Sequence, residues 1–173
     1  MIIGMSVAAF TTLHVVISLV GIASGIVVLV AMLAGKAPAG WTALFLATTI
    51  LTSATGFLFP ATGFTPAQGV GALSLVLLAV ALVAFYGRRL AGAWRWIYVV
   101  TAVPALYFNC FVAVVQSFQK LSFLRPLAPT QSEPPFQIAQ LVVLTIFVVA
   151  MIAAIRKFHP EQTPVARLEP SAS

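Results

Sequence analysis

One histidine, His14, lies within a long apolar stretch of this chain, where a side chain able to ionise or to bind a metal is unusual. At 100° per residue, a helix would place Thr11, Ser18, Gly21 and Gly25 within about 80° of arc together with His14. The two glycines form a Gly-x-x-x-Gly pair, which lets a second helix approach closely. We therefore expect this face to turn toward other helices, where the imidazole would form hydrogen bonds.

Further hydrogen-bonding side chains occur in the later apolar stretches, at depths similar to that of His14. Hydrocarbon penalises unpaired amides strongly, so these side chains need partners or water. The sequence predicts a polar pocket, although the same groups could instead pair with one another and only hold helices together. The candidate ligand-binding residues are His14, Thr52, Thr55, Asn109, Gln116 and Gln140, and Gln137 belongs to the same predicted cluster.

The residue types missing from the apolar stretches exclude several classes of protein. None of the stretches contains Asp, Glu, Lys or Arg, which argues against an ion-coupled pump, a proton relay or a di-metal enzyme. No catalytic motif is present, which favours a protein without intrinsic catalysis, and no metal site is expected. The single cysteine, Cys110, cannot form an intrachain disulfide and is interpreted as a small core residue. Haem would have to be bound either by His14 from two protomers or by a single axial ligand. Apart from haem bound in one of these ways, no cofactor is expected.

The elements that would position these residues are apolar segments of membrane-spanning length. The 173 residues are 61% hydrophobic and only 7% charged, against about 25% charged residues in soluble domains. A helix needs about 20 apolar residues to cross the hydrocarbon core of a bilayer. The sequence therefore predicts an all-α, polytopic bundle of five transmembrane helices, at about residues 5–34, 41–59, 66–86, 96–119 and 134–155.

The distribution of basic residues predicts the orientation of this bundle. Seven of the nine Lys and Arg residues lie in the first and third connections and the C-terminal tail, and two lie in the fourth connection. Cytoplasmic loops carry the excess of basic residues, so we expect the N-terminus outside and the C-terminus inside. The net charge of +6 is thereby explained by topology, and nucleic acid is not an expected partner. The lipid bilayer is the expected partner, with membrane proteins or further copies of the chain as additional candidates.

The segments outside the spans give weaker signals. The first apolar run lacks a basic n-region and is longer than a signal-peptide core, so we expect it to be retained as a helix. Residues 1–158 would form the transmembrane domain, and residues 159–173, rich in Pro, Ser and charge, a disordered cytoplasmic tail. The connection at 120–133 is either a short amphipathic segment on the membrane surface or an ordinary loop.

Three segments carry a resemblance to known proteins. They are Leu51-Thr-Ser-Ala-Thr-Gly-Phe-Leu-Phe-Pro60, Gly92-Ala-Trp-Arg-Trp-Ile-Tyr98 and Ala128-Pro-Thr-Gln-Ser-Glu-Pro-Pro135. They resemble segments of an uncharacterised family of small bacterial inner-membrane proteins to which no activity is assigned. The resemblance would cover nearly the whole chain. The resemblance implies a multi-pass protein of the bacterial cytoplasmic membrane and transfers no functional residues.

These observations lead to one expected function and two alternatives. We expect a small integral membrane protein that binds a small or lipidic ligand, or that acts as a membrane subunit of a larger complex. The first alternative is a redox membrane protein that uses His14 toward haem or quinone. The second alternative is a permeation protein for a neutral solute.

Overall fold

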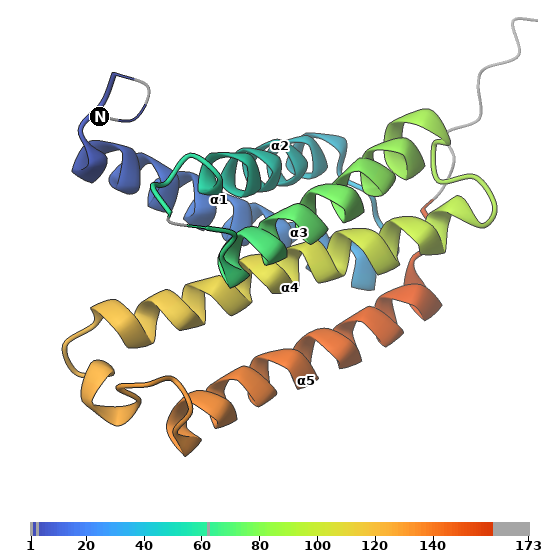
Figure 1. Ribbon diagram of the computed structural model, residues 1–173. Coiled ribbons are helices and arrows are strands. Elements are labelled where there is room, and N and C mark those ends of the chain that lie inside the picture. The colour runs from blue at the N-terminus through green and yellow to red at the C-terminus, as the bar shows by residue number, and fades with distance from the viewer. Residues whose placement is uncertain (1, 3, 62, 161–173) are drawn as a thin grey trace, which may run out of the picture.

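The computed structural model describes residues 2, 4–61 and 63–160, and in this part of the chain the fold is a bundle of α-helices (Figure 1). A π-helical turn, η1 (Val83–Gly87), extends the third helix, and a 3₁₀ turn, η2 (Arg125–Leu127), lies between the last two. The prediction of an all-α bundle is confirmed. The five α-helices of the described residues are α1 (Val7–Leu33), α2 (Ala39–Gly56), α3 (Pro66–Leu82), α4 (Trp94–Lys120) and α5 (Pro134–Lys157).

Local signals in the sequence explain where the helices begin and end. The Ser6 hydroxyl accepts a hydrogen bond from the Ala9 amide and caps α1. Thr65 and Gln68 form a reciprocal capping box at the start of α3. α2 ends three residues earlier than predicted, because the amides of Phe57 and Leu58 bond to carbonyls only three residues back and tighten the chain into a turn.

Four of the five helices in the described residues are long and apolar enough to cross a membrane: α1, α3 with η1, α4 and α5. α2 is not among them, although the sequence pattern predicted a span there. Its 18 residues reach about 27 Å, slightly less than a hydrocarbon core of about 30 Å. It also carries five threonines and one serine, which lower its hydropathy. The structure thus describes a membrane protein with four helices of clear spanning character.

Consecutive helices run in opposite directions, so their ends gather at two sides of the bundle (Figure 1). At one side, the rings of Tyr98 and Phe158 lie 6.0 Å apart, joining the start of α4 to the end of α5. At the other side, Phe10 lies 5.1 Å from Phe59 and joins the start of α1 to the end of α2. We call these sides the basic end and the N-terminal end. The basic end holds Lys36, Arg88, Arg89, Arg95, Arg156 and Lys157, and the N-terminal end holds Lys120 and Arg125.

The bundle is packed most tightly in the half nearer the basic end. In α4, the buried side chains lie between Tyr98 and Leu106, apart from Phe118 near the end of the helix, and none of residues 107–117 is buried. Gly25 of α1 sits against Phe45 and Leu106, where an added Cβ would lie only 2.9 Å from the Phe45 ring. The helices therefore meet closely in this half and leave space in the other half.

Two predicted segments lie outside the helices. The connection at residues 121–133 contains the turn η2 and no α-helix, with the Phe123 side chain 69% exposed. The tail predicted for residues 159–173 lies, from residue 161 onward, outside the described residues.

Candidate functional site

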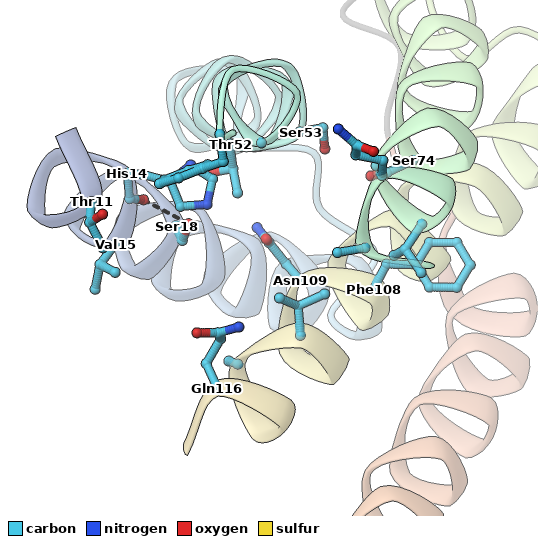
Figure 2. A pocket seen from close by; sticks show the side chains of 18 of the residues that line it. Thr11, His14, Val15, Ser18, Thr52, Ser53, Ser74, Phe108, Asn109 and Gln116 are labelled. Carbon is cyan, nitrogen blue, oxygen red and sulfur yellow. Dashed lines mark hydrogen bonds between the residues drawn. The ribbon is translucent and has the colours of Figure 1, made fainter. Parts of the chain in front are cut away.

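A pocket of about 790 Å³ opens between α1, α2, α3 and α4 in the half of the bundle nearer the N-terminal end (Figure 2). Its volume is within the range of about 300–1,000 Å³ found for small-molecule sites. The walls are mainly apolar, and a few polar side chains interrupt them. The polar lining residues are Thr11, His14, Ser18, Thr52, Ser53, Thr65, Gln68, Ser74, Asn109, Gln116, Ser117 and Lys120.

His14 lines this pocket and is held in place from two directions. Its Nδ1 lies 2.8 Å from the Thr55 hydroxyl, and its ring meets Phe59 edge-on at 5.2 Å. The Thr55 hydroxyl donates its only proton to the carbonyl of Leu51, 2.6 Å away. The oxygen of Thr55 therefore accepts from His14, so Nδ1 carries the proton. The other ring nitrogen, Nε2, keeps its lone pair free to accept a hydrogen bond.

Asn109 lies deeper in the bundle than His14. A Cβ added to Gly21 would lie 3.2 Å from Nδ2 of Asn109 and 3.3 Å from the Thr49 hydroxyl, so these residues share one level. His14 is seven residues outward from Gly21 on α1, about 10 Å nearer the N-terminal end. Gln116 is seven residues outward from Asn109 on α4, which places it at the level of His14. Figure 2 shows Asn109 and Gln116 pointing from α4 toward the wall formed by α1 and α2.

Three buried polar atoms around this deeper level have no hydrogen-bond partner among the described residues. They are Nδ2 of Asn109 and the hydroxyl oxygens of Thr49 and Thr52. Most hydroxyls of the bundle, such as that of Ser18, instead bond to a carbonyl in their own helix. Leaving a buried polar group unpaired costs about 1–3 kcal/mol. Asn109 and Thr52 line the pocket, so a molecule inside it could supply the missing partners.

The structure does not bring the glutamines of α5 to this pocket, contrary to the predicted cluster. Gln140 donates from Nε2 to the carbonyl of Phe111, 3.3 Å away, and Gln137 donates to the carbonyl of Ser132. Phe111 is two residues from Asn109, which is about 200° around α4. α5 therefore packs on the side of α4 that faces away from the pocket. Similar depth in the membrane had suggested a shared site, but depth does not specify the side of a helix.

α3 supplies the fourth wall instead, and the sequence interpretation missed it. Gln68, Gly71 and Ser74 recur every three residues along the first two turns of α3 and all line the pocket. Their spacing was the available signal, since it places small and polar groups on one side of an otherwise apolar helix. Thr55, in contrast, was predicted as a lining residue and instead orients His14 from behind.

The combination of walls and polar groups defines what the pocket can bind. Val15, Leu19, Phe57, Val70 and Val112 provide an apolar surface that favours hydrocarbon. The polar groups at depth offer donors from Asn109 and Thr52 and an acceptor at His14. The arrangement is suited to a mainly apolar molecule with at least one hydrogen-bonding group. Comparison with models of protein families, with curated proteins and with solved structures gave no match for this chain.

Proposed function

We propose that this chain is a five-span protein of a bacterial inner membrane that binds a small or lipidic molecule in the pocket between α1 and α4. In this proposal α2 is the fifth span, the N-terminal end faces outward and the basic end faces the cytoplasm. The accumulation of basic residues at one end supports the orientation. Burial of α2 against α1 supports its place in the membrane, because neighbouring helices shield its hydroxyl groups from lipid. The location in a bacterial inner membrane is proposed from the resemblance of the three sequence segments alone.

The observation that carries the ligand proposal is the set of unpartnered polar atoms beside the pocket. Nδ2 of Asn109 and the hydroxyl oxygen of Thr52 are buried without a partner among the described residues, and both residues line a space of about 790 Å³. If the polar groups only held helices together, they would bond to one another across the bundle. A ligand with an oxygen or nitrogen at this depth gives them partners that the protein itself does not supply.

The shape of the bundle favours binding over permeation. Below the pocket, the basic half is filled by large side chains such as Phe45, Leu106 and Tyr98, each 2% exposed or less. The space among Gly25, Met32 and Phe45 is too small for a water molecule. A molecule that enters the pocket would therefore be retained there and would not pass to the other side.

Extraction of the purified protein with organic solvent, followed by mass spectrometry, tests the ligand proposal. We expect the wild type to carry an apolar molecule that Asn109→Ala and His14→Ala lose by about tenfold or more, because each removes a hydrogen bond to the ligand. Gln140→Ala is the matched control, since its amide lies outside the pocket. Thermal stability of the ligand-free protein should change little, because intramembrane hydrogen bonds are worth about 0.6 kcal/mol. Equal ligand content in all four proteins, or a loss in Gln140→Ala alone, would contradict the proposal.

The redox alternative is favoured by one observation, that Nε2 of His14 has no hydrogen-bond partner among the described residues. This nitrogen could accept from the hydroxyl of a quinol or bind the iron of a haem. The visible absorption spectrum of the purified protein distinguishes haem from other ligands. A Soret band that His14→Ala removes would support the haem form of this alternative.

A further inference from the structure

We infer that the ligand of this pocket is an amphiphile with an anionic, oxygen-rich head, held by Lys120 at the mouth while its apolar chain occupies the interior. This inference rests on the proposed ligand-binding function and adds the chemical class of the ligand.

The pocket-facing side of α4 carries polar side chains at increasing distance from the membrane interior. Asn109, Gln116 and Lys120 lie within about 40° of arc, and all three line the pocket. At about 1.5 Å per residue, Gln116 is about 10 Å and Lys120 about 16 Å outward from Asn109. In the same direction, the side chains change from a half-buried amide at Asn109 to an exposed amide at Gln116 and then to an exposed ammonium group at Lys120. The mouth is therefore the part of the pocket that suits a charged group.

Among the residues that the structure describes, Lys120 is the only charged one that lines the pocket. Glu133 is the one acidic residue within the part of the chain that the structure describes. The Glu133 carboxylate accepts hydrogen bonds from the hydroxyl and amide of Thr130 and from the amide of Ser132. Desolvation acts to raise the pKa of Glu133, but these hydrogen bonds outweigh it and the pKa is lowered. The carboxylate is thus directed into its own loop, and the charge of Lys120 remains available to a ligand.

The interior of the pocket suits the apolar part of such a molecule. Between the levels of Lys120 and Asn109, the walls include Val15, Leu19 and Val112. A head at the mouth and a chain pointing inward is also the orientation that a lipid of the outer leaflet has in the proposed topology. An anion deep in the pocket would in contrast lose its hydration near the neutral side chains of Asn109 and Thr52.

Equilibrium binding to the full-length protein in a neutral maltoside detergent tests this inference, with three radiolabelled probes that share a sixteen-carbon chain. Hexadecanoate carries a carboxylate, palmitoyl lysophosphatidylglycerol carries a phosphate, and 1-hexadecanol is neutral. We expect Lys120→Gln to weaken binding of at least one anionic probe by about fivefold, as for an exposed ion pair, and to leave hexadecanol unchanged. Arg125→Gln is the control, because it removes the same charge from the same end but not from the pocket.

The outcomes separate this inference from the proposed function. If Lys120→Gln selectively weakens the binding of hexadecanoate, the ligand has a carboxylate head. If it selectively weakens the binding of the lysophospholipid, the ligand has a lipid phosphate. Both results support the inference. Equal effects of Lys120→Gln on anionic and neutral probes, or an equal effect of Arg125→Gln, would overturn it while leaving the pocket as a ligand site. Failure of all three probes to bind the wild type would overturn the inference. The solvent extraction of purified protein would then decide the proposed function on its own.

Discussion

Two glycines of α1 set how closely this helix approaches its neighbours. A Cβ on Gly25 would collide with Leu106 and lie 2.9 Å from two atoms of the Phe45 ring. A Cβ on Gly21 would lie 3.2–3.3 Å from Asn109, Thr48 and Thr49, which is tight but less severe. The difference follows from position, since Gly25 faces the packed half of the bundle and Gly21 the bottom of the pocket.

We therefore expect Gly25→Ala to destabilise the protein by about 1–3 kcal/mol, the usual cost of overfilling a packed core. Gly40→Ala, in the first turn of α2, is the control, because nothing lies within 4 Å of the added Cβ. It should be neutral or slightly stabilising, since alanine favours helix more than glycine does. Thermal unfolding in detergent measures both variants, and equal stability of the two would contradict the packing described for Gly25.

The sequence predicted the identity of several pocket residues better than their partners. His14 and Asn109 were identifiable because a histidine and an amide are rare in apolar helices. The inward direction of the face with Gly21 and Gly25 was also predictable from the spacing of small residues. The bond between His14 and Thr55 was not, since it depends on the rotation of α2 about its own axis. The same uncertainty about rotation led to the wrong placement of Gln140.

At the scale of the helices, α2 and α5 differ in how much of their surface the neighbouring helices cover. Thr42, Phe45, Leu46 and Thr49 of α2 are buried, so neighbouring helices cover much of its surface. α5 has only Ala154 fully buried and exposes apolar side chains over about half of its circumference. A long helix with a broad exposed apolar face is suited to contact with lipid. Hydropathy alone detects α5 easily and α2 poorly, although both belong to the same bundle.

Reporter fusions test whether α2 crosses the membrane. With five spans and the N-terminus outside, alkaline phosphatase fused after Thr65 or after Thr130 should be active, and a fusion after Gly87 should be inactive. The enzyme requires the oxidising side of the membrane to form its disulfides. If α2 does not cross, the fusions after Thr65 and Gly87 should exchange their activities while the fusion after Thr130 changes as well. Activity after Gly87 would therefore contradict the proposed topology of five spans with the N-terminus outside.

At the scale of the whole molecule, the bundle is closed at the basic end and open toward the N-terminal end. Large buried side chains such as Phe45, Tyr98 and Phe158 hold the helices together at the basic end. In the other half, α1 and α4 present small and polar side chains, and the volume between them is not filled. The number and order of the helices were predictable from the five apolar stretches that contain no charged residue. The pocket was only partly predictable, because it depends on which helix faces which neighbour.

The central claim, that the space between α1 and α4 holds a ligand, is tested most directly by filling that space. Ala113 lines the pocket on α4, and Ala79 of α3 is exposed on the outside of the bundle. Native mass spectrometry of protein released from mild detergent measures the fraction of molecules that carry a bound mass. The account predicts that Ala113→Phe loses this mass while Ala79→Phe and the wild type retain it. Full retention of the bound mass in Ala113→Phe would contradict the claim.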